Sequence, residues 1–146
     1  MIRRATIDDL DSIVSIENRV FREPWTKKQI LNELKQLSGK IVNVIEKEDI
    51  IGYIMVQKVQ NEAQILNIAI DIHCQCKGLG KKLLKHTLDE LGSETDVFLE
   101  VRESNLQAIK LYSDFNFEDI GIRQGYYSDG ENALMMHKRE ETYAMV

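Results

Sequence analysis

Proline, tryptophan and cysteine are scarce in this sequence, with one Pro, one Trp and two Cys among 146 residues. The two cysteines, Cys74 and Cys76, are separated by one residue. In a chain without a recognisable signal peptide they indicate a reducing compartment, and we expect the cytoplasm. No apolar run approaches the length of a membrane span, so we expect no membrane partner. Internal repeats, linkers and low-complexity stretches are also lacking.

Positive charge is in short supply as well, because 19 Lys and Arg face 24 Asp and Glu, a net charge of −5. This balance lacks the general footprint of a nucleic-acid-binding protein, so we expect no direct nucleic-acid partner. An acidic surface can still attract a basic protein tail. With 43% hydrophobic residues, a chain of this length can bury a substantial core. We therefore expect one domain, residues 1–146, and a monomer.

One stretch, residues 66–91, organises the rest of the chain. An apolar run of strand length, 66–70, leads into a loop with two glycines, Gly78 and Gly80. Leucines at helical spacing then follow at positions 79, 83, 84, 88 and 91. A glycine-rich turn from strand to helix lets backbone N–H groups approach an anion, and the helix N-terminus adds partial positive charge. Lys81 and Lys82 reinforce that sign, so the stretch predicts a phosphate or pyrophosphate site.

Two familiar phosphate-binding motifs do not fit this stretch. A Walker loop needs Gly where Gln75 stands, and Ser or Thr where Lys82 stands. The dinucleotide fingerprint needs a third glycine where Leu83 stands, which disfavours a Rossmann-like nucleotide-binding module. What remains is the pattern Gln75-x-x-Gly78-x-Gly80, whose plainest interpretation is a tight turn that caps an amphipathic helix.

The spacing of apolar and turn residues predicts an α+β domain with a mixed sheet. Along the chain we expect a strand, two helices, three strands, a helix, a strand, a helix and two strands. The strands are predicted at residues 2–5, 41–45, 50–56, 63–70, 97–101, 117–122 and 133–137. Strands 63–70 and 97–101 should run parallel, because a helix separates them.

Helix ends are predicted from capping residues. Thr6 and Thr26 are the expected N-caps of the first two helices, and the apolar stripe of the second continues to Leu37. Ser104 is expected to cap the last helix. The tail from Arg139 onward is expected to be frayed.

The glycine loop and the order of elements resemble the GCN5-related N-acetyltransferases (GNAT), and most of all the RimI-type ribosomal-protein alanine N-acetyltransferases. The likeness covers nearly the whole chain. Its segments are Pro24-Trp25, Asn67-Ile68-Ala69-Ile70, Leu99-Glu100-Val101-Arg102 with Ser104-Asn105, Ala108-Ile109 with Leu111-Tyr112, and Tyr126-Tyr127 ahead of Asp129-Gly130. Ile72, Cys76 and Gly125 depart from the usual pattern, which bears on phosphate affinity and substrate fit but not on the fold.

The resemblance implies a GNAT fold, a mixed central β-sheet flanked by helices in which two parallel strands splay apart. The cosubstrate would be acetyl-CoA, with its pantetheine arm between those strands. On this analogy the backbone of Ile68, Ala69 and Ile70 pairs with the arm. Asn105 would hydrogen-bond the cofactor, although helix capping explains it equally well from local sequence. The pyrophosphate would be held by Gln75, Cys76, Lys77, Gly78, Leu79, Gly80 and Lys81.

Acetyl transfer needs a neutral amine to attack a thioester and a proton donor for the departing thiolate. Glu100 is the odd residue in the apolar run 97–101, where a carboxylate is costly unless solvated or used. The resemblance implies Glu100 as the base and Tyr112 as the acid. Without it, Glu100 would be a strand-end ion pair and Tyr112 a core aromatic. Trp25, Tyr126 and Tyr127 would be substrate contacts if they line a groove.

Other chemistries have weaker support in the sequence. His73, Cys74 and Cys76 do not match zinc-site spacing, so we expect no metal. Neither cysteine resembles an activated nucleophile, which favours direct transfer over an acetyl-enzyme. The resemblance implies acetylation of the N-terminal alanine of small-subunit ribosomal protein eighteen, presented as a peptide end. The alternatives are an acetyltransferase for a lysine or small amine, and a non-catalytic acyl-CoA-binding regulator.

Overall fold

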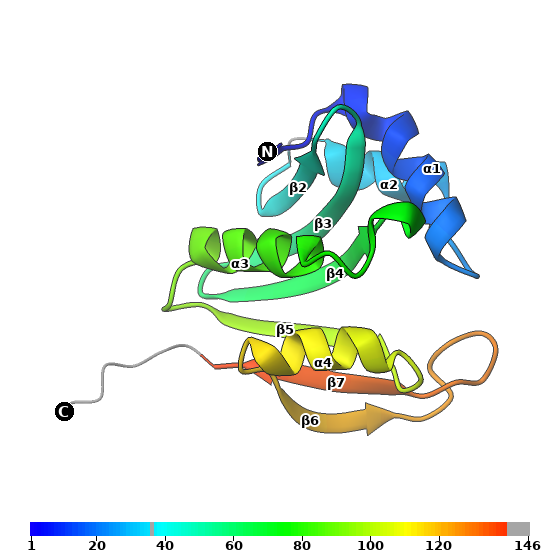
Figure 1. Cartoon of the computed structure of the whole chain (residues 1–146). Helices are drawn as coiled ribbons and strands as arrows, with labels where there is room; N and C mark the ends of the chain where they lie inside the picture. The colour runs from blue at the N-terminus through cyan, green and yellow to red at the C-terminus, as the bar shows by residue number, and fades with distance from the viewer. Residues whose placement is uncertain (36, 140–146) are drawn as a thin grey trace.

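The computed structural model describes residues 1–35 and 37–139 (Figure 1). The order of elements along the chain is the predicted one. The strands are β1 (Ile2–Arg4), β2 (Lys40–Glu46), β3 (Ile50–Val59), β4 (Glu62–Ile70), β5 (Asp96–Arg102), β6 (Glu118–Arg123) and β7 (Ala133–Lys138). The helices are α1 (Leu10–Val20), α2 (Lys27–Leu34), α3 (Leu79–Leu91) and α4 (Leu106–Asp114), with short 3-10 helices η1 (Ile7–Asp9) and η2 (Ile72–Cys74).

The described residues form one seven-stranded sheet in the order β1-β2-β3-β4-β5-β7-β6. Within this part of the chain the β4–β5 pair is parallel, as predicted, and the other five pairings are antiparallel. The α+β class and the mixed sheet are therefore confirmed.

The parallel strands β4 and β5 separate part-way along their length. Their pairing runs from Glu62 with Asp96 to Ile65 with Leu99 and stops there. The register between β3 and β4 shifts at the same point, because Val56 pairs with Ile65 and Met55 with Asn67, which leaves Leu66 as the extra residue of a β-bulge. A bulge bends its strand and increases the local twist. Figure 1 shows the result, with β4 curving away from β5 toward the carboxyl ends of both strands.

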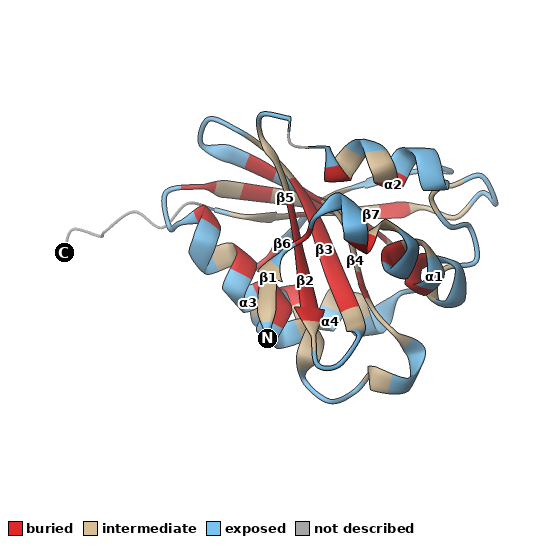
Figure 2. Cartoon of the chain, turned by 90° about the horizontal axis from the view of Figure 1, so that it is seen from above, coloured by how far each residue is buried: buried red, intermediate tan, exposed pale blue. Residues whose placement is uncertain are grey.

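Helices cover both faces of the sheet. On one face, α3 and α4 pack on Ile54, Val56 and Leu99. On the other, α1 and α2 pack on Tyr53 and Met55, which alternate with the first set along β3. Burying one such apolar side chain contributes about 1.5–3 kcal/mol to folding. Figure 2 shows the central strands buried between helices whose outer sides are exposed.

The predicted N-caps Thr6 and Thr26 are confirmed, whereas the predicted end of α2 is not. Thr6 and Thr26 each form a capping box with the residue three positions on, ahead of η1 and α2. Helix α2 ends at Leu34, so the predicted stripe to Leu37 is wrong, and Leu37 is 57% exposed. The tail prediction concerns residues that, Arg139 apart, lie outside the described residues.

Candidate active site

The loop from β4 to α3 forms a backbone cradle at a helix N-terminus. Gly78 is the N-cap of α3 and has φ of +78°, a left-handed conformation that favours glycine. A Cβ on Gly78 would meet no atom within 4 Å, so the space beside it is open. Since the first N–H groups of a helix have no partner within it, this end of α3 can bind an anion.

Two side-chain contacts hold the cradle in place. The Gln75 Nε2 donates to the Ile70 carbonyl oxygen at 2.9 Å, which folds the loop back on the end of β4. The Asp71 carboxylate accepts from the Arg19 Nε and Nη2 at 2.9 and 2.8 Å, and this pairing lowers the pKa of Asp71. The loop is therefore tied to both β4 and α1. Cys76, which follows Gln75, has φ of +63°, unusual for a residue with a side chain.

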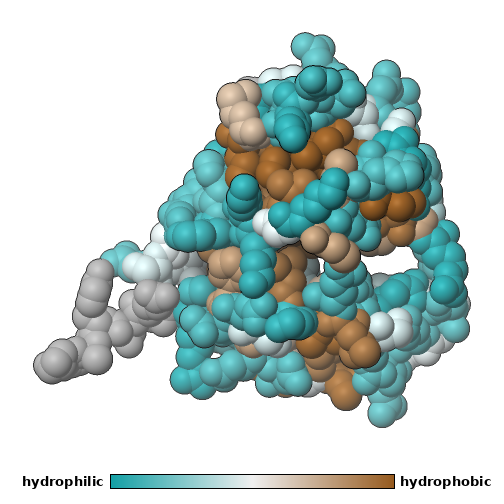
Figure 3. All heavy atoms as spheres, viewed as in Figure 1, coloured by the Kyte–Doolittle hydropathy of each residue, from teal (hydrophilic) through white to brown (hydrophobic). Residues whose placement is uncertain are grey.

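A pocket of about 480 Å³ extends from this cradle along the open edge of β4. Ile68, Ala69 and Ile70 line it. These residues pair with β3 on one side but have no β5 partner on the other in the described structure. Their free backbone edge can therefore accept an extended chain as a neighbouring strand would. Figure 3 shows the surface hollowed on this side of the molecule.

Most of the predicted cofactor residues come together around this pocket. Its lining includes Gln75, Cys76, Gly78, Leu79, Gly80, Lys81 and Asn105. Lys77, the remaining predicted residue, is not among the lining residues. The Lys81 Nζ lies 3.5 Å from an Asp114 carboxylate oxygen on α4.

Asn105 has the capping role that local sequence allowed, and it lies at the pocket too. It is the N-cap of α4, so the prediction that Ser104 caps this helix is wrong. The Asn105 Oδ1 accepts from the Ala108 backbone N–H at 3.1 Å. Its amide nitrogen is left to face other partners, so capping and ligand binding are compatible in one side chain.

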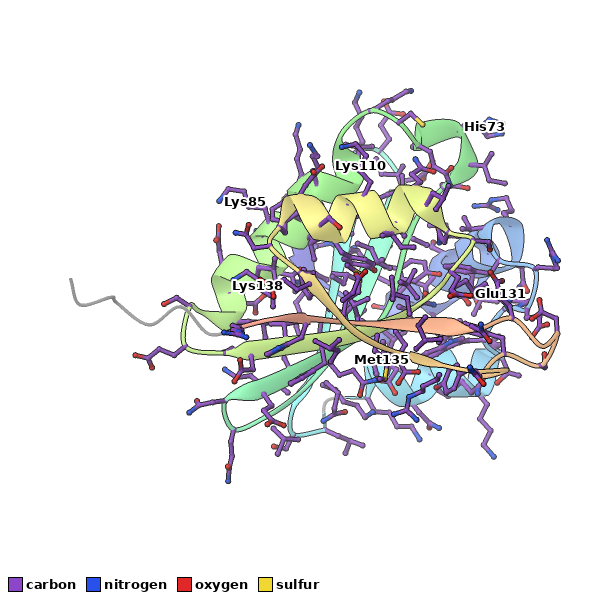
Figure 4. The ribbon with its side chains drawn as sticks, turned by 90° about the horizontal axis from the view of Figure 1, so that it is seen from below. His73, Lys85, Lys110, Glu131, Met135 and Lys138 are labelled. Carbon is purple, nitrogen blue, oxygen red and sulfur yellow. The ribbon has the colours of Figure 1, made fainter. Side chains whose placement is uncertain are left out.

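Glu100 lies beside the point where β4 and β5 part, on the face of the sheet away from α3 and α4. This follows from strand alternation, because Leu99 and Val101 belong to the core beneath those helices. Met135, on the neighbouring strand β7, pairs with Glu100. Figure 4 shows the Met135 side chain on the side of the sheet away from α4. A groove of about 340 Å³ runs over this face, lined by Glu100, Met135 and Arg123 among others.

The two oxygens of the Glu100 carboxylate have different surroundings. The Arg123 Nε lies 3.4 Å from Oε1. Oε2 is buried and has no hydrogen-bond partner in the described structure. A buried acceptor without a donor is costly, and such an atom is available to a donor that enters the groove. A hydrogen bond to the Glu100 carboxylate and, after it, burial raise the pKa of Tyr126.

Tyr112 lies on the opposite face of the sheet and is not among the residues that line the pocket or the groove. It is buried in the core beneath α3 and α4, as its place on the sheet-facing stripe predicted. Burial, and to a lesser extent the neighbouring Tyr127, raise the pKa of Tyr112 above the usual range of a phenol. Its hydroxyl is therefore protonated near neutral pH and can act as a donor. Glu100 and Tyr112 flank β5 from its two sides.

The aromatic residues predicted to contact substrate lie on two loops. Trp25, half-buried against the core beneath α1, is on the α1–α2 loop (residues 21–26). Tyr126 and Tyr127 are on the β6–β7 loop (residues 124–132). Their rings form an edge-to-face pair with centroids 5.2 Å apart. Tyr126 is 51% exposed, near Glu100, whereas Tyr127 is covered by the Arg102 guanidinium at 4.1 Å. None of the ring–ring contacts among the described residues includes Trp25.

Arg102 connects these two loops, a role that sequence reasoning missed. Its Nη1 lies 2.8 Å from an Asp129 oxygen and 2.9 Å from a Glu131 oxygen on the β6–β7 loop. Its Nη2 lies 3.9 Å from Glu23 on the α1–α2 loop, which also accepts a hydrogen bond from Ser128. The two loops thus meet across the face that carries Glu100.

Comparison with known proteins agrees with this geometry. The family model for the acetyltransferase (GNAT) family matches residues 10–117. The chain belongs to the GNAT family. It is 36% identical over 141 residues to the [ribosomal protein bS18]-alanine N-acetyltransferase of Escherichia coli K12, covering 88% of this chain and 89% of that protein.

Two further comparisons extend the likeness within the GNAT family. The enzyme of the same name from Haemophilus ducreyi is 35% identical over 144 residues, covering 93% of this chain and 97% of that protein. The crystal structure of the Escherichia coli ribosomal-protein-S18-alanine N-acetyltransferase superposes with a TM-score of 0.90 at 32% identity, covering 99% of this chain and 96% of that one. The chain is accordingly an acetyltransferase with the GNAT fold, and GNAT acetyltransferases use acetyl-CoA.

The GNAT pocket also includes residues that the sequence did not single out as site residues. Val20 and Phe21, from the end of α1, form one wall, and Gln107, Lys110 and Asp114 of α4 join Ala108 and Leu111 in another. The apolar stripe of α4 gave a signal for Ala108 and Leu111. The others are brought to the pocket by tertiary packing alone. Figure 4 shows Lys110 on α4 directed away from the sheet, toward the side on which the loop with His73 lies.

The described residues contain neither a metal-binding cluster nor a membrane-spanning helix. No group of three or more His, Cys, Asp and Glu side chains in residues 1–35 and 37–139 is arranged to hold a metal ion. None of the helices in that part of the chain combines the length and apolar character needed to cross a bilayer.

Proposed function

We propose that this GNAT enzyme transfers the acetyl group of acetyl-CoA directly to the N-terminal alanine of small-subunit ribosomal protein bS18, in a ternary complex. The observation that carries the proposal is the gap between β4 and β5, with an anion cradle at one end and Glu100 beside its vertex. The names of the relatives at 35–36% identity support the acceptor. We also propose that residues 1–146 form one catalytic domain that acts in the cytoplasm.

The residues of the pocket fit acetyl-CoA. Gly78 and the first turn of α3 would hold the pyrophosphate with backbone N–H groups, since no side chain fills the space there. The free edge of β4 at 68–70 would hydrogen-bond the amides of the pantetheine arm. Acetyl-CoA supplies the thioester whose acetyl group is transferred.

Glu100 is proposed as the base that prepares the acceptor amine. The amine must lose a proton before it can attack, and the unpartnered Oε2 of Glu100 can accept that proton directly or through one water. The Arg123 Nε lies 3.4 Å from the other oxygen, so this ion pair occupies Oε1 and leaves Oε2 for the amine.

Tyr112 is proposed as the acid. Expulsion of the thiol group needs a proton, and the buried, protonated Tyr112 hydroxyl on the other side of β5 can supply it. Glu100 and Tyr112 thus lie on opposite faces of β5. The amine would give its proton to Glu100 as it enters from the groove, and the thiol would take a proton from Tyr112 on the other face.

An N-terminal α-amine suits a single modest base. Its pKa is about 8, against about 10.4 for a lysine side chain, so more of it is already neutral at physiological pH. The joined α1–α2 and β6–β7 loops, with Trp25, Tyr126 and Tyr127, would contact the first residues of the acceptor.

Mass spectrometry of ribosomal proteins from cells with and without the enzyme tests the proposal. We expect the N-terminal alanine of bS18 to be acetylated only when the enzyme is present. If lysine side chains change instead, the acceptor is a lysine. If purified enzyme binds acetyl-CoA and acetylates no amine, the chain is an acyl-CoA-binding regulator.

A further inference from the structure

Glu17 is a buried carboxylate that the proposed chemistry does not use. It lies on α1, is 1% exposed, and has no ion pair with any residue in the described parts of the chain. Oε1 accepts hydrogen bonds from the Tyr53 hydroxyl and, at 2.7 Å, from the Asn67 Nδ2. Oε2 accepts from the Trp25 backbone N–H at 2.9 Å.

Packing alone does not account for a carboxylate in this place. Its neighbours on the buried side of α1 are Ile13 and Ile16, which are fully enclosed. Removing a charge from water is costly unless the carboxylate is well hydrogen-bonded, and an apolar side chain on this face would carry no such cost. The three donors offset that cost only if all of them reach the carboxylate. The elements that carry these three donors indicate why a carboxylate is present here.

The donors at the carboxylate include groups from both sides of the site. Asn67 directly follows the bulge residue Leu66, where β4 leaves β5 and its free edge begins. Trp25 belongs to the α1–α2 loop, whose Phe21 lines the acetyl-CoA pocket and whose Glu23 meets Arg102. The buried Glu17 side chain thus links the bend of β4, which borders the acetyl-CoA pocket, to the α1–α2 loop, which faces the acceptor amine.

We propose that Glu17 is a positioning residue, which holds the α1–α2 loop against β4 so that the acceptor amine reaches the thioester. The proposal rests on the proposed function, because it assumes that the loop guides the acceptor. The part played by Glu17 is to accept the hydrogen bond of the Trp25 N–H, a donor that cannot turn away, while the Asn67 amide and the Tyr53 hydroxyl can reorient.

This difference between the donors gives a sharp pair of variants. Glu17→Gln keeps one oxygen, which can face the Trp25 N–H while its amide nitrogen faces a flipped Asn67 amide and a rotated Tyr53 hydroxyl. Glu17→Met has similar length and no comparable acceptor, so the Trp25 N–H is left without its partner. A matched control, Tyr53→Phe, removes a hydrogen bond to the same carboxylate from β3 and leaves the Trp25 contact intact.

We expect activity to depend on the Trp25 contact, and not on every loss of stability among these proteins. For an alanine-starting peptide, kcat/KM should fall at least about tenfold in Glu17→Met, chiefly through KM, and stay within about threefold in Glu17→Gln and Tyr53→Phe. Acetyl-CoA affinity should stay within about threefold in all of them, because residues 68–70 keep their pairing with β3. All three variants should stay folded at the assay temperature, with Glu17→Met the least stable because it leaves buried donors without an acceptor. Hydrogen exchange of the Trp25 amide should be at least about tenfold faster in Glu17→Met only.

Two results would overturn the positioning role. One is a Glu17→Met enzyme that keeps kcat/KM within about threefold of the parent. The other is a loss of activity in all three variants that follows their loss of stability. Failure of the proposed function would look different: the parent itself would not acetylate the alanine-starting peptide. The same variants would then be compared with the amine that the parent does acetylate, and an enzyme that acetylates no amine would overturn both ideas.

Discussion

Replacing Gly80 by Glu should weaken acetyl-CoA binding without unfolding the enzyme. Gly80 is the second residue of α3 and lines the pocket. A Cβ at this position would meet Leu111 Cδ2 at 3.7 Å and Ile70 Cγ1 at 3.9 Å, which are ordinary contact distances. The fold can therefore accept a side chain here, whereas the ligand's phosphates would have to share the cradle with it.

The size of the effect follows from charge and reach. A carboxylate about 5 Å from one phosphate charge costs about 3 kcal/mol at an effective dielectric constant of about 20, before screening by salt. Since about 1.4 kcal/mol is tenfold in Kd, we expect the charge alone to weaken binding between about tenfold and about a hundredfold.

Isothermal titration calorimetry of Gly80→Glu, Gly80→Gln and the parent separates charge from size. Gln has the same reach without the charge, so its Kd should lie between the other two. The Kd ratio of the Glu and Gln variants should shrink as salt is added. Equal Kd values in Gly80→Glu and the parent would refute the assignment of this loop to the pyrophosphate.

Three further changes test the proposed chemistry and the fold. Tyr112→Phe should lower turnover by about 10²–10⁴-fold with acetyl-CoA affinity within a few-fold, because one oxygen is removed; parental turnover at every pH would make Tyr112 a packing residue. Glu100→Gln should lose activity on the same scale, with the remainder rising toward higher pH as more amine is neutral; an unchanged pH profile would place the base elsewhere. The Arg3 guanidinium, which pairs with both Asp9 oxygens at 2.9 Å, holds the pKa of Asp9 below its usual range. Its contribution to stability is therefore present above about pH 4 and lost as the pH falls through the lowered pKa. Asp9→Asn should cost about 1–3 kcal/mol in urea unfolding at pH 7 and progressively less as the pH falls through the lowered pKa of Asp9; a cost that does not change with pH would contradict the pairing.

Local sequence predicted the fold because its signals are local. Capping residues such as Thr26 and the glycine loop at Gly78 act within one turn of the chain, and the alternation of strand residues sets the two faces of the sheet. The stripe through Leu37 failed since α2 ends at Leu34 and leaves Leu37 largely exposed, and spacing alone cannot tell an exposed leucine from a buried one.

Features that depend on pairing between distant elements could not be predicted in this way. The bulge at Leu66 exists only in the register of β4 against β3. Arg102 and Glu17 acquire their roles from loops and strands far along the chain. A signal for Glu17 was present nonetheless: it stands four residues after Ile13, on the apolar face of α1, where an acid is out of place.

The central claim, transfer to a terminal α-amine, is tested most directly by two peptides given to the same enzyme. One begins with a free alanine, and the other has the same sequence with a blocked N-terminus and an internal lysine. Acetylation rates at saturating acetyl-CoA are measured for both. We expect rapid acetylation of the free alanine and little of the lysine, and comparable rates on the two peptides would contradict the claim.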